Sequence, residues 1–86
     1  MKFRLSRHAL EELERRGIPR DLLEETLENP QQVLPERDGM KVYQSQVRFA
    51  GSKLFLLRAI VNDAVEPAVV VTVYRTSKIE KYWRSP

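Results

Sequence analysis

The sequence predicts an α+β domain in which a helical hairpin packs on one face of a four-stranded, mainly antiparallel sheet. Apolar residues recur at helical spacing as far as Asn29-Pro30, and beyond that point the period changes to two. Three β-forming runs then follow one another, and helices that precede sequential strands are typical of α+β domains. A chain of 86 residues suits one domain, so residues 1–86 are expected to fold as a single unit.

The first helix is expected to follow a short strand that runs from Met1 to Leu5. Ser6 is suited to cap this helix, because its hydroxyl can accept an unpaired backbone N–H. Gly17 is expected to end the helix in a left-handed conformation, which costs glycine little. The stripe expected to face the core consists of Ala9, Leu10, Leu13 and Gly17.

The second helix is expected between two prolines. Ile18-Pro19-Arg20-Asp21 opens it, since proline is tolerated in a first helical turn. Asn29-Pro30 ends it, because the residue before a proline disfavours the α region. The expected apolar face consists of Leu22, Leu23 and Leu27.

Four strands are expected in the remainder of the chain. The first is the short run Gln32 to Pro35, which the turn Arg37-Asp38-Gly39 joins to the next strand. Ala50-Gly51-Ser52 joins the first two long strands, and Ser77 is expected to cap a last helical turn. The long strands are Val42–Phe49, Leu54–Val61 and Ala68–Arg75.

The alternation of side chains along these strands predicts two different sheet faces. On the last strand, Val69, Val71 and Val73 are expected to face the helices. The opposite, open face is expected to gather Gln44, Gln46, Arg48, Arg58, Thr72 and Tyr74. A slip of one residue in register would exchange the two faces. This open face has two interpretations, a phosphate-binding platform and the ordinary solvated face of an antiparallel sheet.

Composition excludes several classes of site. The chain has no cysteine, which excludes disulfides and thiolate metal ligands and favours a reducing compartment. With one histidine as well, neither a metal site nor a cofactor is expected. No apolar run approaches the roughly 20 residues of a membrane span, and the N-terminus does not resemble a signal peptide. A cytoplasmic protein is therefore expected, with no membrane contact.

Charge is distributed unevenly along the chain. The net charge is +3, and residues 31–86 carry nine basic and five acidic side chains. Basic groups interleaved with aromatic rings suit contacts to phosphates and stacking on bases. The alternative is a solvated tail whose aromatic rings pack on the core. The expected nucleic-acid-binding residues are Arg48, Arg75, Lys78, Lys81, Tyr82 and Trp83.

His8 is the only histidine and lies in the first turn of the expected helix. With an unperturbed pKa of about 6.5, an imidazole exchanges protons at neutral pH. RNA cleavage by attack of the 2′-OH needs a base, an acid and cations that stabilise phosphate charge. Glu12 lies one turn further on the same helical face, where it could orient the ring or carry a second proton. The alternative for His8 is a structural hydrogen bond at the start of the helix.

Short motifs extend across nearly the whole chain. They are Ser6-x-His8-Ala9, Arg16-Gly17-Ile18, a second helix that ends in Asn29-Pro30, and Val71-Thr72-Val73-Tyr74-Arg75-Thr76 with its T-x-Y feature. Together they resemble a family of small bacterial proteins of uncharacterised function that look like relatives of the RelE/ParE toxins. Such relatives often carry a basic residue four positions after the histidine, where this chain has Glu12.

The resemblance implies the fold shared by RelE, barnase, EndoU and colicin-type ribonucleases, and a cognate antitoxin as partner. The leading hypothesis is a metal-independent, toxin-like endoribonuclease with RNA, free or ribosome-associated, as substrate. The alternative is a non-catalytic toxin or regulatory module that binds a protein such as gyrase, or nucleic acid, through the open sheet face. The catalytic residues expected are His8, Arg16, Arg58, Thr72 and Tyr74, and Arg58 enters from the face pattern rather than from a motif.

Overall fold

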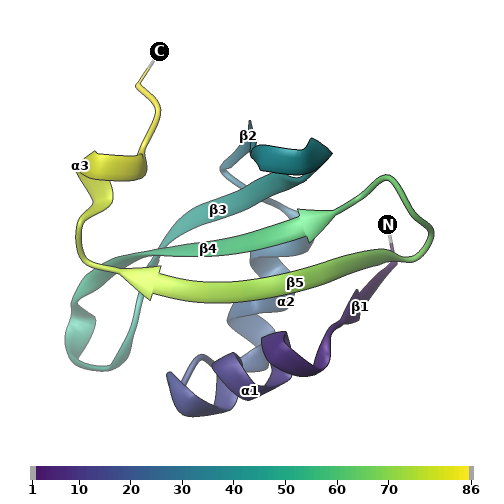
Figure 1. The fold of residues 1–86 in the computed structure, drawn as a ribbon. Helices are drawn as coiled ribbons and strands as arrows, with labels where there is room; N and C mark the ends of the chain where they lie inside the picture. The colour runs from purple at the N-terminus through teal and green to yellow at the C-terminus, as the bar shows by residue number, and fades with distance from the viewer. Residues whose placement is uncertain (1, 86) are drawn as a thin grey trace.

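A computed structural model describes residues 2–85 of the chain. The elements follow the predicted order, with two helices before the long strands and a short helix after them (Figure 1). They are β1 (Phe3–Leu5), α1 (Arg7–Arg15), α2 (Arg20–Glu28), β2 (Gln32–Pro35), β3 (Lys41–Arg48), β4 (Leu54–Asn62), β5 (Ala68–Thr76) and α3 (Ile79–Tyr82).

The sheet has five strands and is mixed, which corrects the prediction of four mainly antiparallel strands. Its order is β1-β5-β4-β3-β2. Strands β2 to β5 pair antiparallel with their sequence neighbours, whereas β1 pairs parallel to β5 through Phe3 opposite Ala68. The short first strand was predicted, but its partner was not. Two parallel strands need a long crossover connection, and here the α1–α2 hairpin and β2 to β4 form that connection between β1 and β5.

Local signals set the helix boundaries as predicted. The backbone N–H of Ala9 donates to the Ser6 hydroxyl at 3.0 Å, so Ser6 caps α1. Gly17 has a φ of +62°, the left-handed conformation that ends this helix at low cost to glycine. Helix α2 starts directly after Pro19 and ends at Glu28, just before Asn29-Pro30.

Helices α1 and α2 cover one side of the sheet, and α3 lies on the other side (Figure 1). The core lies between the two helices and the sheet, and it includes Ala9 and Leu13 of α1 and Leu23 and Leu27 of α2. Leu10, which was expected in this core, is 46% exposed. Glu12 is buried instead, because α1 turns Ala9, Glu12 and Leu13 toward the sheet and leaves Leu10 on its flank.

A β-bulge in β5 corrects the predicted faces of this strand. Val73 lies in the core as expected, but the core then continues through Val70 and Ala68, rather than through Val71 and Val69. Thr72 pairs with Ile60 and Val70 pairs with Val61, so Val71 has no partner in β4. One extra residue in a strand reverses the alternation beyond it. The predicted face of Thr72 and Tyr74 is unaffected, because they follow the bulge.

The C-terminal helical turn differs in its cap. Ser77 was expected to cap it, but α3 starts after Lys78 and has no side-chain cap. The Thr76 hydroxyl accepts the backbone N–H of Lys78 at 3.0 Å and so turns the chain out of β5. Within residues 2–85, no helix is long and apolar enough to cross a membrane.

Candidate functional site

A row of four polar side chains crosses the sheet on the face opposite α1 and α2. The strand register places them side by side, from β2 through β3 and β4 to β5. They are Gln32, Gln44, Arg58 and Tyr74, and together they form the polar row. Because each occupies the directly opposite position on the next strand, their side chains are within reach of one another.

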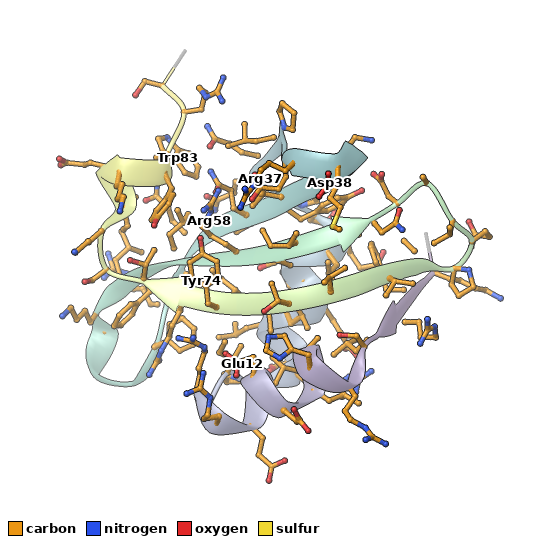
Figure 2. The ribbon with its side chains drawn as sticks, viewed as in Figure 1. Glu12, Arg37, Asp38, Arg58, Tyr74 and Trp83 are labelled. Carbon is orange, nitrogen blue, oxygen red and sulfur yellow. The ribbon has the colours of Figure 1, made fainter. Side chains whose placement is uncertain are left out.

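Arg58 is the centre of the polar row. Its Nε donates to Gln44 Oε1 at 2.8 Å, and its Nη1 donates to the hydroxyl of Tyr74. The guanidinium carbon also lies 4.2 Å from the centre of the Tyr82 ring, which belongs to α3. Figure 2 shows the Tyr74 side chain rising from β5 toward Arg58, on the same side of the sheet as Trp83. Arg58 is thereby fixed in position, and only 8% of its surface is exposed.

The partners of Arg58 are all neutral. Among residues 2–85 it forms no ion pair, although arginines are rarely buried without a carboxylate. Amide, phenol and aromatic partners hold the guanidinium in place without cancelling its charge. Since arginine stays protonated at all physiological pH values, this position carries a full positive charge at rest. The arrangement is chemically suited to binding an anion.

Residues 78–85, the C-terminal strap, cover this arrangement. Gln32 forms a reciprocal pair with the backbone of Arg84, in which Gln32 Nε2 donates to the carbonyl at 2.6 Å and Arg84 N–H donates to Oε1 at 3.2 Å. Gln44 Nε2 donates to the carbonyl of Tyr82 at 3.3 Å and to Gln32 Oε1 at 2.7 Å. The predicted open face is therefore covered where Arg58 lies.

A second arginine cluster lies at the end of α1. Arg15 donates through Nε and Nη2 to the two carboxylate oxygens of Glu12, both at 2.9 Å, and Arg16 Nε donates to the same carboxylate at 2.7 Å. The hydrogen bonds from Arg15 and Arg16 lower the pKa of Glu12 to about 2. Glu12 is therefore ionised at neutral pH and is unsuited to donate a proton there. Figure 2 shows Glu12 and Arg58 on opposite sides of β5.

The structure divides the predicted catalytic set. Arg58 and Tyr74 are hydrogen-bonded, and Thr72 lies two residues before Tyr74 on the same face of β5. Arg16 binds Glu12 on the other side of the sheet instead. His8 is exposed on α1, and no hydrogen bond or ion pair joins it to the polar row within residues 2–85.

The first turn of α1 is nevertheless anchored to β5. The Ser6 hydroxyl donates to the carbonyl of Val71 at 2.8 Å, and the backbone N–H of Ser6 donates to the carbonyl of Val70 at 3.0 Å. The N-cap residue of α1 is therefore hydrogen-bonded to the bulge at Val71, directly before Thr72. His8, two residues after Ser6, belongs to this anchored turn.

The predicted nucleic-acid-binding residues are distributed over both faces. Arg75 lies over the Phe49 and Phe55 rings on the core side, at 4.5 and 4.9 Å from their centres. Arg48 is exposed, and its Nη1 donates to the carbonyl of Ser52 in its own hairpin at 2.6 Å. The others form part of the C-terminal strap, where Lys78 and Lys81 are exposed and Tyr82 and Trp83 are half-buried.

Sequence reasoning placed Gln44 on the open face but not among the expected site residues, and it assigned no role to Gln32. A glutamine side chain does not titrate, and neither glutamine belongs to a recognisable sequence motif. The role of each depends on which backbone groups lie opposite its amide in the folded protein. Within residues 2–85, no group of three His, Asp or Glu side chains is placed to hold a metal ion.

Comparison with known proteins identifies a family but no activity. A family model described as a domain of unknown function (DUF4258) matches residues 5–75, which run from the last residue of β1 through α1, α2 and β2 to β4 and end one residue before the end of β5. Neither a curated protein nor a solved structure matches the chain. The match covers most of the chain and ends at β5, before the C-terminal strap. The chain therefore belongs to the DUF4258 family of domains of unknown function.

Proposed function

We propose that this protein binds single-stranded RNA through Arg58 and Tyr74 of the polar row, with Arg58 holding a backbone phosphate. The observation that carries the proposal is that Arg58 is more than nine-tenths buried and yet has only neutral partners among residues 2–85. A buried charge without a counter-ion is costly, and a bound anion removes that cost. We expect the protein to act in the cytoplasm, where RNA is present.

The identity of the anion follows from the chemistry around Arg58. A guanidinium presents a planar fork of donors that matches phosphate oxygens, and its Nη2 group is not engaged by Gln44 or Tyr74. The C-terminal strap adds Lys78, Lys81 and Arg84 close to the rings of Tyr82 and Trp83. Basic groups beside aromatic rings favour a chain of phosphates that also carries bases over a small carboxylate.

The test is fluorescence anisotropy with a labelled oligouridylate, using Arg58→Gln. Loss of a hydrogen-bonded phosphate contact worth about 1.5–3 kcal/mol weakens binding about 10- to 100-fold. The matched control is Arg20→Gln, which removes the same charge from an exposed position of α2, on the other side of the sheet from the polar row, and is expected to change affinity only a few-fold. Equal affinities of the two variants would exclude Arg58 as the phosphate contact. Thermal unfolding of each variant checks that it is folded.

A second candidate is toxin-like endoribonuclease activity, as the RelE/ParE resemblance implies; it requires RNA to reach His8 on α1 as well as the polar row on the other side of the sheet. It is favoured by the hydrogen bond of Ser6 to Val71, which ties the helical turn of His8 to the strand of Thr72 and Tyr74. In this mechanism Arg58 stabilises phosphate charge, Thr72 and Tyr74 position the phosphate, and His8 exchanges protons with the ribose or the leaving group. Arg16 is omitted from the mechanism, because Glu12 engages it.

The endoribonuclease candidate is tested by expressing wild type and His8→Ala in growing cells and measuring growth and RNA integrity. Loss of a general acid–base group lowers cleavage by purified protein about 10²–10⁴-fold. Glu11→Ala, at an exposed position of the same helix, is the control for folding and solubility. If RNA stays intact when wild type is expressed, cleavage is excluded and RNA binding remains the proposed function. Growth arrest without loss of RNA would favour a protein target. An antitoxin reading frame beside the gene would support a toxin–antitoxin pair.

A further inference from the structure

The C-terminal strap covers the site that Arg58 forms. Its Tyr82 ring lies over the guanidinium at 4.2 Å and meets the Tyr74 ring edge-on at 6.4 Å between centres. An aromatic ring above a guanidinium plane is also how a nucleic-acid base stacks on an arginine. The Tyr82 ring therefore occupies the place that a base of a bound strand would take.

One of the hydrogen bonds of the strap also resembles a contact that a nucleic-acid base makes. The carbonyl of Tyr82 accepts from the side-chain amide of Gln44, as a carbonyl of a base would. The backbone of Arg84 pairs reciprocally with the amide of Gln32, which lies on β2, two strands away from Arg58. Ring stacking and amide pairing are thus both directed at the polar row.

The strap is attached weakly. Helix α3 has four residues, none of them buried, and lacks a side-chain cap. Apart from the hydrogen bond of the Lys78 N–H to Thr76, the hydrogen bonds and ring contacts that join the strap to the other described residues go to Gln32, Gln44, Arg58 and Tyr74. A segment with few buried apolar contacts opens at a small fraction of the free energy of global unfolding. Because these contacts lie on the polar row, opening of the strap exposes Arg58.

We propose that residues 78–85 act as an intramolecular competitor of single-stranded RNA, which has to displace the strap before a base stacks on Arg58. This inference rests on the proposed function and adds its regulation. The affinity measured for RNA is then the intrinsic affinity multiplied by the fraction of molecules in which the strap is open. Any change that releases the strap without altering Arg58 strengthens RNA binding.

The first experiment uses Gln32→Ala in the full chain, with Gln31→Ala as the matched control. Gln32 holds the strap, whereas Gln31 forms a similar reciprocal pair with the backbone of Gln46 in β3. Gln32→Ala is expected to increase acrylamide quenching of Trp83, the single tryptophan, and to strengthen oligouridylate binding about three- to tenfold. Gln31→Ala is expected to change neither quantity.

The outcomes separate this inference from the proposed function. If wild type binds oligouridylate through Arg58 but Gln32→Ala does not bind more tightly, the competition is wrong and the binding function stands. If wild type does not bind oligouridylate, or Arg58→Gln binds as well as wild type, the proposed function is wrong. Unchanged quenching of Trp83 in Gln32→Ala would show that Gln32 does not hold the strap, which also overturns the inference.

A second measurement needs no variant. The backbone amide of Arg84 donates to Gln32, so its hydrogen exchange, followed by NMR, reports closure of the strap. Saturating oligouridylate is expected to accelerate exchange at Arg84 while the amides of β4 stay protected. Retained protection at Arg84 in the RNA-bound protein would overturn the inference.

Discussion

Two arginine clusters lie on opposite sides of the same sheet, and they differ in what the guanidinium groups bind. At the end of α1, Arg15 and Arg16 both donate to the carboxylate of Glu12. In the polar row, Arg58 donates to an amide and a phenol, and a ring covers it. The side chains of Arg15 and Arg16 are 68% and 38% exposed, whereas Arg58 is buried.

The difference teaches how charge and position are related in this protein. The carboxylate of Glu12 compensates one of the two positive charges of Arg15 and Arg16. One positive charge of this cluster is therefore left for a ligand. Arg58 is held as firmly by neutral partners but keeps its whole charge. A guanidinium that is fixed in position and has no counter-ion is expected in a preorganised anion site. A guanidinium that is fixed by a carboxylate is expected in an ion-pair network at the end of a helix.

The largest expected effect comes from giving Arg58 the carboxylate that it lacks. Gln44→Glu preserves the shape of the side chain and the acceptor for Arg58 Nε, and it pairs the guanidinium with a negative charge. It also removes the Nε2 donor to Gln32 and Tyr82, so release of the strap acts against the loss of affinity that the ion pair causes. An ion pair worth about 1.5–3 kcal/mol would compete with phosphate, so oligouridylate affinity is expected to fall about 10- to 100-fold in anisotropy titrations. Gln46→Glu makes the same charge change two residues along β3 and serves as control. Similar losses in both variants would mean that only net charge matters.

A smaller effect is expected from Tyr74→Phe. This substitution removes the hydroxyl that accepts from Arg58 Nη1 and leaves the ring that meets Tyr82. One hydrogen bond of about 0.5–1.5 kcal/mol is lost, so RNA affinity is expected to fall about three- to tenfold, with little change in the unfolding temperature. Wild-type affinity in Tyr74→Phe would show that the hydroxyl does not position Arg58 for binding.

The smallest effect at neutral pH, and a distinct one in acid, is expected from Glu12→Gln. Hydrogen bonds from Arg15, then Arg16, lower the pKa of Glu12 from 4.5 to about 2. A carboxyl whose folded pKa is depressed contributes stability above its unfolded pKa and loses it as pH falls toward the folded pKa. The urea midpoint of wild type should therefore decrease between about pH 4.5 and pH 2, and Glu12→Gln should lose this part of the decrease. Parallel pH profiles would contradict the ion-pair network.

The predictable part of the fold was set by residues with strong local preferences. Ser6, Gly17 and Asn29-Pro30 mark helix boundaries through a cap, a positive φ and the steric demand of proline, none of which depends on distant residues. The order of the elements and the juxtaposition of Arg58 with Tyr74 followed from periodicity alone. These predictions are confirmed because their physical causes act within a few residues along the chain.

The errors concern contacts between distant parts of the chain. The alternation in β5 could not reveal the bulge at Val71, whose carbonyl accepts the Ser6 hydroxyl from the start of the chain. The parallel partner of β1 and the exposure of Leu10 depend on where α1 rests against the sheet. The catalytic roles of His8 and Thr72 remain predictions, because nothing in the structure tests whether these side chains take part in a reaction.

The sequence by itself determined where α1 and α2 begin and end and which side chains share a face of β3 and β4, because backbone sterics and side-chain periodicity act locally. The tertiary structure alone decided that the tail returns over the polar row, that Gln32 and Gln44 hold it, and that Arg58 is buried without a carboxylate partner among residues 2–85. These features depend on groups separated by as many as 52 positions in the chain. Amide pairing at that separation leaves no periodic or compositional signal, so it becomes visible only when the chain has folded.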